Sequence, residues 1–325
     1  MLTVSVVIPV YRAERTLRML HEQLTATMAR LAAVFEIIFV EDCGGDGSWP
    51  LIVELASADN RVRGIRMSRN YGQHNAVLCG IRAARYDVIV TMDDDLQHPV
   101  SEIAKLLTAL AADVDVVYGA PMREQHGLLR DLASRLTKLT LASTMDAEVA
   151  RNVSAFRAFR TRLRDGFRDY RSPTVSVDVL LTWSTSRFTA IKVRHAPRTI
   201  GVSGYTLAHL VRHAMNLMTG FSTLPLQVAS IIGFAFLLFG LSILVFVLGN
   251  FLVNGSSVPG FAFLASIITI FSGAQLFALG VIGEYLARMH FRSMDRPTYL
   301  VRETTAADSV DRADVSEPSP AGSGN

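Results

Sequence analysis

The sequence predicts an α/β protein that begins with a doubly wound, mostly parallel sheet and ends with interfacial helices and a two-helix transmembrane hairpin. Three observations lead to this prediction. Short apolar runs alternate with helical patterns over residues 2–118, as in βαβ units with right-handed crossovers. No Asp, Glu, Lys or Arg occurs between Arg212 and Glu284. Polar clusters follow three of the predicted strands, where ligands of such sheets bind.

Strands and helices of the first part follow one another in a regular order. Continuous apolar runs are typical of strands that are buried on both faces of a parallel sheet. These runs predict strands at Leu2–Pro9, Phe35–Val40, Val62–Met67, Asp87–Met92, Val114–Tyr118 and Phe188–His195. Between the strands, apolar residues recur at helical spacing. This spacing predicts helices at Glu14–Leu31, Ser48–Ala58, Asn75–Ala84 and Val100–Ala112.

The last part of the chain has the composition of a membrane hairpin. Leu226–Leu252 and Phe261–Ile282 each exceed the roughly 20 residues that cross a hydrocarbon core. Arg212 precedes them, Arg288, Arg292 and Arg296 follow them, and the connecting loop has no Lys or Arg. This charge pattern predicts a multi-pass protein of the plasma or inner membrane with its first part in the cytoplasm. The alternative, a hairpin buried in a soluble core, is disfavoured by the length of the spans.

Two amphipathic patterns precede the hairpin. Gly127–Leu141 predicts a basic amphipathic helix, and Tyr205–Phe221 predicts a helix that lies in the membrane interface. Residues after Ala306 have no core pattern and are expected to be disordered. The expected division is a cytoplasmic domain at 1–204, an interfacial helix at 205–224, two transmembrane helices at 225–285, a juxtamembrane segment at 286–303 and a tail at 304–325.

Composition excludes some classes of function. The net charge of +3 fits contact with an anionic membrane surface but is too small to indicate nucleic-acid binding. Cys43 and Cys79 have neither a CxxC partner nor a His cluster, so we expect no disulfide and no thiolate metal site. No G-x-G-x-x-G follows the first strand, which argues against a dinucleotide-binding dehydrogenase.

Three adjacent carboxylates, Asp93, Asp94 and Asp95, follow the fourth predicted strand. Clustered acids repel one another, and a divalent cation removes that cost. Oxygen ligands suit Mg²⁺ or Mn²⁺, which would bridge the phosphates of a nucleotide sugar and take up charge as the diphosphate leaves. Strand alternation would place Asp93 and Asp95 on one side and Asp94 on the other. The alternative is a solvated acidic turn, but the position at a strand end before Gln97 and Pro99 favours the metal.

Two further clusters follow the first and second strands. Glu41–Ser48 is a glycine-rich turn in which a carboxylate can accept an N–H of a pyrimidine or guanine ring, or in which Asp46 or Ser48 only caps the following helix. After Pro9, Tyr11 can cover a base, and Glu14 either contacts the nucleotide or simply lies in a helix first turn, where negative charge is favoured.

Together these clusters resemble the family-2 inverting glycosyltransferases of the GT-A fold, and more narrowly the polyprenyl-phosphate glycosyltransferases. This group includes dolichyl-phosphate mannose synthases and undecaprenyl-phosphate glucosyl- and aminoarabinose-type transferases. The motifs that carry the resemblance are SVVIPVYRAE (Ser5–Glu14), VEDCGGDGS (Val40–Ser48), RNYGQHNA (Arg69–Ala76), MDDDLQHP (Met92–Pro99), VVYGAPMRE (Val116–Glu124), GVSGY (Gly201–Tyr205), FSTLPL (Phe221–Leu226) and GEYLARMHFRSMDRPTY (Gly283–Tyr299). They extend to about residue 300, and the NYGQH segment is most similar to the aminoarabinose-type branch.

The resemblance implies roles for individual residues. The nucleotide sugar would be bound by Pro9, Tyr11, Glu14, Asp42, Asp93, Asp94 and Gln97. The Mg²⁺ or Mn²⁺ would be held by Asp93, Asp95 and Gln97. The acceptor phosphate would be met by Arg123, Ser134, Arg198 and Ser203, although the arginines can instead contact lipid headgroups. Relatives form tetramers, which makes a homo-oligomer an expectation by resemblance.

The sequence departs from the family pattern in places. Arg12 and Ala13 replace the usual Asn-Glu pair, and Glu41 replaces Asp. The segment Arg151–Arg157 contains no Asp, although relatives carry there a Gly-Asp whose Asp is a candidate base. The second pKa of a phosphate monoester is about 6, so the acceptor needs no proton removed. Catalysis would then rest on positioning and on stabilising the leaving group, with Asp95 and Arg157 as the catalytic residues.

The predicted reaction is a single displacement in which the lipid phosphate attacks the sugar, the nucleotide diphosphate leaves and configuration inverts. A polysaccharide synthase would need more membrane spans and a downstream Gln-x-x-Arg-Trp segment, which this sequence lacks. A non-catalytic membrane scaffold that kept the fold is the alternative from another class, and the intact acids at Asp93–Asp95 argue against it.

Overall fold

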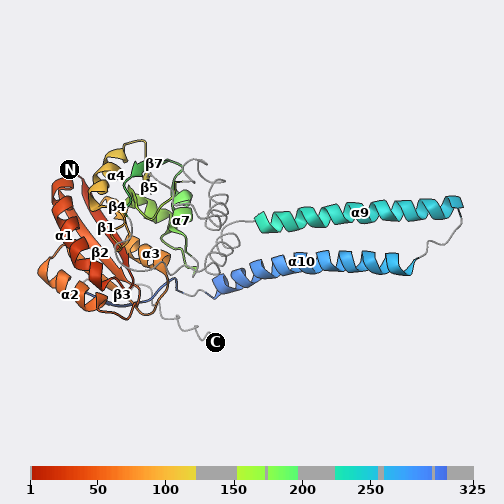
Figure 1. Ribbon diagram of the computed structural model, residues 1–325, viewed down its shortest axis with the longest axis horizontal. Coiled ribbons are helices and arrows are strands. Elements are labelled where there is room, and N and C mark those ends of the chain that lie inside the picture. The colour runs from red at the N-terminus through yellow and green to blue at the C-terminus, as the bar shows by residue number, and fades with distance from the viewer. Residues whose placement is uncertain are drawn as a thin grey trace, which may run out of the picture. The chain divides into compact units, whose positions relative to one another are not determined.

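A computed structural model describes residues 2–121, 152–172, 175–196, 224–254, 260–294 and 297–305 of the chain (Figure 1). The chain divides into two compact units. The first comprises Met1–Leu96 and Tyr299–Asn325, and the second comprises Gln97–Thr298. The first unit therefore contains a segment that follows the apolar helices in the sequence.

A mixed sheet forms the centre of the first unit. Its strand order is β4-β1-β2-β3-β8. β1, β2, β3 and β4 are parallel, and β8 pairs antiparallel with β3. The strands are β1 (Thr3–Val10), β2 (Val34–Glu41), β3 (Val62–Met67), β4 (Val88–Thr91) and β8 (Val301–Thr304). The connecting helices are α1 (Glu14–Leu31), α2 (Ser48–Ala58) and α3 (Gln73–Ala83).

The core of this unit follows from the spacing of apolar residues. On α1, Leu17, Leu20 and Leu24 recur at helical spacing and are fully buried. α3 packs closely on the sheet, because a side chain at Gly80 would place its Cβ 2.3 Å from a methyl carbon of Val7. The alternation of apolar strands and amphipathic helices in the sequence thus produces the doubly wound sheet that was predicted.

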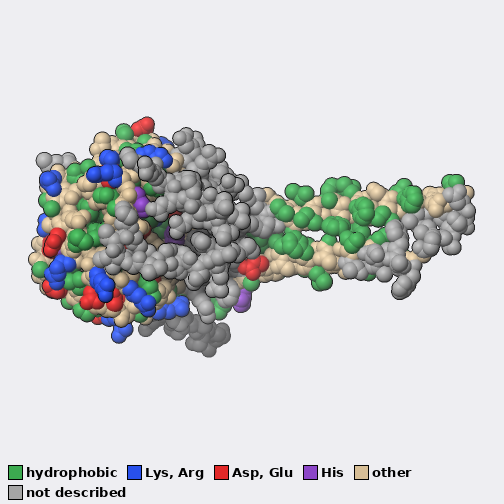
Figure 2. All heavy atoms as spheres, viewed as in Figure 1, with side chains coloured by type: hydrophobic (Ala, Val, Ile, Leu, Met, Phe, Trp, Pro, Cys, Tyr) green, Lys and Arg blue, Asp and Glu red, His purple; other side chains and the backbone are tan. Residues whose placement is uncertain are grey.

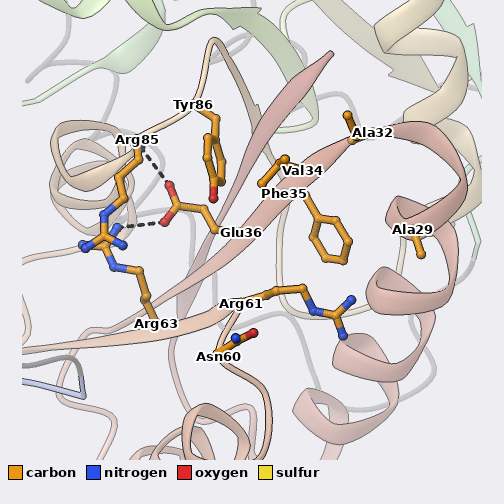
Figure 3. Close-up of a pocket in the computed structure, with 11 residues that line it drawn as sticks. Ala29, Ala32, Val34, Phe35, Glu36, Asn60, Arg61, Arg63, Arg85 and Tyr86 are labelled. Carbon is orange, nitrogen blue, oxygen red and sulfur yellow. Dashed lines mark hydrogen bonds and ion pairs between the residues drawn. The ribbon is translucent and has the colours of Figure 1, made fainter. Parts of the chain in front are cut away.

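A buried carboxylate fastens the amino ends of these strands. Glu36 accepts hydrogen bonds from the Ser5 hydroxyl (2.7 Å), from an Arg63 guanidinium nitrogen (2.9 Å) and from the Arg85 backbone N–H (2.8 Å). Figure 3 shows Glu36 joined by dashed lines to Arg63 and Arg85, and Glu36 and Phe35 line a hollow of about 470 Å³. Glu36 thus has a structural role in joining these strands. The hollow lies at the amino-terminal edge of the sheet, opposite the carboxyl-terminal edge where ligands of parallel sheets bind.

The second unit contains a smaller set of paired strands, in the order β7-β5-β6. β5 runs parallel to β7 and antiparallel to β6. The strands are β5 (Val116–Pro121), β6 (Arg157–Arg160) and β7 (Phe188–Val193). The short helices are η1 (Val100–Glu102), α4 (Ile103–Ala109), η2 (Thr161–Phe167) and α7 (Val177–Ser184). A buried acid, Asp115, accepts hydrogen bonds from Arg162 and Arg187 and so joins β5 to its neighbours.

Two long apolar helices also belong to the second unit. α9 (Leu224–Asn254) and α10 (Phe261–Ser293) pack together, with the rings of Phe236 and Phe271 5.7 Å apart. Each contains a window long and apolar enough to cross a membrane, Leu226–Ile243 and Ile270–Ala287, and 6% and 0% of these windows is buried. Figure 2 shows apolar side chains along the outside of both helices. A helix of a soluble core would bury such side chains, so this exposure favours a lipid environment.

The structure confirms the predicted fold class and the order of its main elements, with three differences. α10 continues to Ser293, beyond the predicted end at Ile282, because charged side chains are compatible with a helix where it leaves an apolar layer. The predicted helix at Val100–Ala112 begins as the short η1 and ends at Ala109. β6, α7 and β8 were not predicted: β6 and β8 are short and rich in charged residues, and α7 is a short apolar segment of eight residues. Residues 127–141, 205–221 and 306–325, where two helices and a tail were predicted, lie outside the described residues.

Candidate functional site

Three strained turns lie at the carboxyl ends of β1, β2 and β4. Arg12, Cys43 and Leu96 have φ angles of 56°, 55° and 60°, and they are the positive-φ residues other than glycine in the described part of the chain. Such conformations cost about 1–2 kcal/mol per residue. Strain of this kind gathers at functional sites, where surrounding contacts hold the backbone in place. All three turns belong to the first unit, at the sheet edge where ligands of parallel sheets bind.

The turn after β1 and the turn after β2 hold each other. The Arg12 Nε donates to the Gly44 carbonyl oxygen (3.0 Å), and the Glu14 carboxylate accepts the Gly47 N–H (3.2 Å). Asp46 accepts the Glu14 N–H (3.3 Å). A side chain at Gly47 would put its Cβ 2.4 Å from the Glu14 carboxylate. Glu14 therefore has a clear structural role in shaping this edge, whichever contact it makes with a nucleotide.

Asp42 connects the turn after β2 to the start of α3. Its two carboxylate oxygens accept the backbone N–H groups of Tyr71 (2.7 Å) and Gly72 (2.8 Å). Burial raises the pKa of Asp42, although these two hydrogen bonds oppose the shift. Gly72 has a φ of 93°, which favours glycine. The RNYGQH segment is thus held in place by an acid that was predicted to bind the nucleotide.

The neighbouring Glu41 explains one departure from the family pattern. Its carboxylate accepts the Gly44 N–H (2.6 Å) and the Arg66 Nε–H (3.2 Å). An Asp at this position has a shorter side chain by one methylene. Glu41 therefore supports the glycine-rich turn from behind, and it is 2% exposed.

The three acids after β4 face different partners. Gln73 donates to Asp93 (2.6 Å), and Asp94 accepts the backbone N–H of Tyr11 (3.0 Å). Burial raises the pKa of Asp94 to about 7, the Tyr11 N–H opposes this shift, and the charges of Asp93 and Asp95 add to it. Because β4 ends at Thr91, the acids lie in a turn, and strand alternation does not describe them.

The remaining residues that were predicted to bind the nucleotide sugar, Pro9, Tyr11 and Gln97, lie in different surroundings. Pro9 is buried in β1 opposite Val40. Tyr11 is 46% exposed, with the Arg12 guanidinium 5.2 Å from the centre of its ring. An exposed aromatic ring beside the acidic turn suits contact with a base. Gln97 begins the second unit, where its backbone oxygen accepts the Ala196 N–H (2.7 Å).

The acids can take part in a metal site only together with other ligands. Within the described residues, no three His, Cys, Asp or Glu side chains converge closely enough to hold a cation. This agrees with the chemistry of Mg²⁺, which is usually bound by one or two carboxylates together with substrate phosphates and water. The oxygen donors of Asp93 and Asp95 fit such a cation.

Arg157 lies in the interior of the second unit. Its side chain is 2% exposed and forms an ion pair with Asp178, which also accepts the Tyr118 hydroxyl (3.0 Å). Burial raises the pKa of Tyr118 well above its usual value. This position supports β5, β6 and α7, and the proposed contact with the acceptor phosphate stays a prediction. Predicted acceptor residues outside the described part of the chain are Arg123, Ser134, Arg198 and Ser203.

Sequence reasoning missed several residues of the site. Gln73, Tyr71 and Gly72 lie in a motif that the resemblance used, but their contacts with Asp93 and Asp42 depend on the crossover from β3 to α3. Arg66 and Asp178 carried no sequence signal, because their partners are distant in the chain.

The parallel sheet and the acidic turns at its carboxyl edge are typical of a glycosyltransferase, and the chain also carries two helices long and apolar enough to cross a membrane. The chain belongs to glycosyl transferase family 2, whose sequence model matches residues 5–168. The predicted family and enzyme class are thereby confirmed.

The sequence is similar to that of known proteins over nearly its whole length. An undecaprenyl-phosphate 4-deoxy-4-formamido-L-arabinose transferase of Pectobacterium carotovorum subsp. carotovorum (strain PC1) is 32% identical over 94% of each chain. The protein of the same name from Yersinia pestis (strain Pestoides F) is 31% identical over 95% of each chain.

The mannosyl-3-phosphoglycerate synthase structure from Rubrobacter xylanophilus has a TM-score of 0.48 and 16% identity, and covers 66% of this chain and 70% of its own. A glucosyl-3-phosphoglycerate synthase from Mycobacterium tuberculosis, crystallised with Mn²⁺ and UDP-glucose, has a TM-score of 0.49 and 17% identity over 67% of this chain and 78% of its own.

Proposed function

We propose that this enzyme transfers one glycosyl group from a nucleotide diphosphate sugar to a polyprenyl phosphate, with inversion, at the cytoplasmic face of a membrane. The observation that carries the proposal is the cluster of strained turns that brings the buried Asp42 and the acids Asp93 and Asp95 to one sheet edge. The exposed apolar faces of α9 and α10 support a multi-pass arrangement and a lipid acceptor. The lengthwise similarity to relatives whose names include undecaprenyl phosphate supports the same acceptor class.

On this proposal, Asp93, Asp95 and Gln97 would hold Mg²⁺ or Mn²⁺, which would neutralise charge on the leaving diphosphate. Tyr11 would cover the base, and Asp42 would accept one of its N–H groups. The acidic turn and its neighbours would hold the donor so that the anomeric carbon faces the acceptor, which supplies its own nucleophilic oxygen. Arg123, Ser134, Arg198 and Ser203 would bind the acceptor phosphate, and a homo-oligomer is proposed by resemblance alone.

Transfer by the purified full-length protein tests the proposal. Undecaprenyl phosphate and Mn²⁺ are supplied with UDP-, GDP- and dTDP-linked sugars, including a nucleotide-linked 4-deoxy-4-formamido-L-arabinose, and the product is identified by mass spectrometry. We expect one donor to yield a lipid carrying a single sugar. Transfer by Asp95→Ala should fall at least about 100-fold while membrane insertion is unchanged.

The two alternatives give different results in the same assay. A membrane scaffold would neither hydrolyse nor transfer any donor. A polysaccharide synthase would add many sugars to one acceptor. Wild-type turnover by Asp95→Ala would refute the role given to the acidic turn.

A further inference from the structure

β8 completes the edge of the sheet from the far end of the chain. Its neighbourhood is fixed by backbone pairing with β3, by the Gly64 N–H donating to the Thr305 hydroxyl (2.8 Å) and by the Ser68 N–H donating to the Leu300 carbonyl (2.9 Å). A side chain at Gly64 would approach Thr305 to 2.8 Å. α10 ends at Ser293 and β8 begins at Val301, so the chain returns to the first unit directly after the apolar helices.

An aromatic residue anchors the start of this segment. The guanidinium carbon of Arg82, at the end of α3, lies 5.6 Å from the centre of the Tyr299 ring. Burial raises the pKa of the Tyr299 phenol, so its hydroxyl stays neutral. Tyr299 therefore packs into the first unit and fixes the segment from which β8 begins.

One chain of contacts runs from β8 to the glycine-rich turn. Glu303 accepts a hydrogen bond from Arg66 (2.8 Å), Arg66 donates its Nε–H to Glu41 (3.2 Å), and Glu41 accepts the N–H of Gly44 (2.6 Å). The Arg66 guanidinium carbon also lies 5.8 Å from the centre of the Trp49 ring. Glu41 is buried, and a buried carboxylate without its cation is costly. Arg66 thus neutralises the acid that shapes the turn, and Glu303 fixes the position of Arg66.

A second chain of contacts reaches the same place through the loop before α3. The Leu300 carbonyl accepts the Ser68 N–H (2.9 Å), and the hydroxyls of Ser68 and Tyr71 lie 3.1 Å apart. The Tyr71 N–H in turn donates to Asp42 (2.7 Å). Two separate routes, one from Glu303 in β8 and one from Leu300 directly before it, therefore lead to the consecutive residues Glu41 and Asp42.

We propose that β8 is a positioning element of the nucleotide site, in which Glu303 and Arg66 hold the turn that carries Asp42. The role in nucleotide binding rests on the proposed function, whereas the mechanical link does not. The donor site would be complete only when the segment that follows the apolar hairpin has paired with β3. Glu303 and Arg66 would then act on donor affinity without touching the donor.

Hydrogen exchange on the full-length protein without nucleotide tests the link. We expect peptides that contain Gly44 to exchange about twofold to fivefold faster in Glu303→Gln, because an exposed ion pair is lost. The matched control is Glu54→Gln, which removes the exposed Arg18–Glu54 pair (2.9 Å) from α1 and α2. Unchanged exchange in Glu303→Gln, or equal acceleration in the control, overturns the inference.

Calorimetric titration with UDP, GDP and dTDP, each with Mn²⁺, tests the functional part. For the nucleotide that the wild type binds, we expect Glu303→Gln to raise Kd about twofold to fivefold and Glu54→Gln to leave it unchanged, at equal thermal midpoints. In an Arg66→Gln background, Glu303→Gln should add nothing, because the route is already broken. An additive effect or an unchanged Kd overturns the role in nucleotide binding. If the wild type binds none of the three nucleotides, the proposed function fails, and the exchange experiment alone decides the link.

Discussion

Asp42 offers the sharpest test of how the donor edge is built, because the Asp42→Asn variant keeps its size and removes its charge. The carboxylate accepts two backbone N–H groups, from Tyr71 and Gly72. Asn can accept only one of them, and its NH₂ group then faces the other. A hydrogen bond to a charged acceptor contributes about 1.5–3 kcal/mol, and an orphaned buried N–H costs about 1–3 kcal/mol.

These terms do not act alone. Burial raises the pKa of Asp42, so the native carboxylate carries a desolvation penalty that Asn avoids. We therefore expect the free energy of unfolding to fall by about 1–3 kcal/mol. If Asp42 also accepts an N–H of the base, the Kd for the nucleotide should rise about tenfold or more, the value of one charge-assisted hydrogen bond.

Two measurements separate these effects. Urea unfolding, followed by Trp49 fluorescence in a Trp183→Phe background, gives the stability change, and calorimetry with UDP or GDP and Mn²⁺ gives the Kd. Asp59→Asn is the control, because Asp59 accepts the Arg61 N–H (3.0 Å) at the other end of β3 and should affect stability alone. An unchanged free energy of unfolding in Asp42→Asn would refute the stabilising role of the two hydrogen bonds from Tyr71 and Gly72 to Asp42. A stability loss with an unchanged Kd would refute its contact with the base.

Three further predictions follow from other contacts. Arg157→Met leaves the Asp178 carboxylate buried without its cation, so urea denaturation should show a loss of about 3–5 kcal/mol; an equal loss in the Arg157→Met, Asp178→Asn double variant would contradict this reasoning. Hydrogen bonding with Arg61 lowers the pKa of Asp59 from 3.8 to about 2, so its stabilisation is present above pH 3.8 and disappears as pH falls through 2. As pH falls through this range, the free energy of unfolding should therefore decrease by about 1 kcal/mol more in the wild type than in Asp59→Asn. Plots of unfolding free energy against pH that run parallel for the two proteins would refute the pairing. A chain cut after Tyr205 loses β8 as well as the hairpin, so its UDP affinity should improve when a peptide of residues 297–305 is added; identical Kd values with and without the peptide would argue against this.

The link from β8 changes how a truncated enzyme is interpreted. The predicted boundary at 204 assigned everything after it to interfacial, transmembrane and juxtamembrane segments or to a tail. In the structure, Val301–Thr304 pairs with β3, and Glu303 reaches Arg66. Loss of activity on truncation therefore does not by itself measure the contribution of the apolar helices.

Two departures from the family pattern, at Arg12 and Glu41, are explained by the contacts of these residues. Arg12 has a positive φ and bonds to the Gly44 carbonyl, so it ties two turns together. Glu41 uses its extra methylene to reach both Gly44 and Arg66. Each substitution forms part of a network within this chain.

The sequence by itself determined the fold class, the family and the position of the acidic turns. Apolar periodicity marked the strands and helices from Thr3 to Tyr118, since each element must bury one face or both. The stretch without charged residues predicted α9 and α10, because each apolar span is long enough to cross the hydrocarbon core of a bilayer. The acids after β4 were found because carboxylates after an apolar strand need a partner.

Only the tertiary structure decided which partner each acid has. Gln73 donates to Asp93, and the backbone N–H groups of Tyr71 and Gly72 donate to Asp42. Glu303 accepts a hydrogen bond from Arg66, which is 237 residues away along the chain. Arg157, predicted to meet a phosphate, is paired with Asp178 in the interior. Periodicity reports whether a residue is buried, because burial repeats with the turn of a helix or the pleat of a strand. It carries no information on which distant side chain satisfies a buried charge, since that depends on how strands and crossovers bring separate segments together.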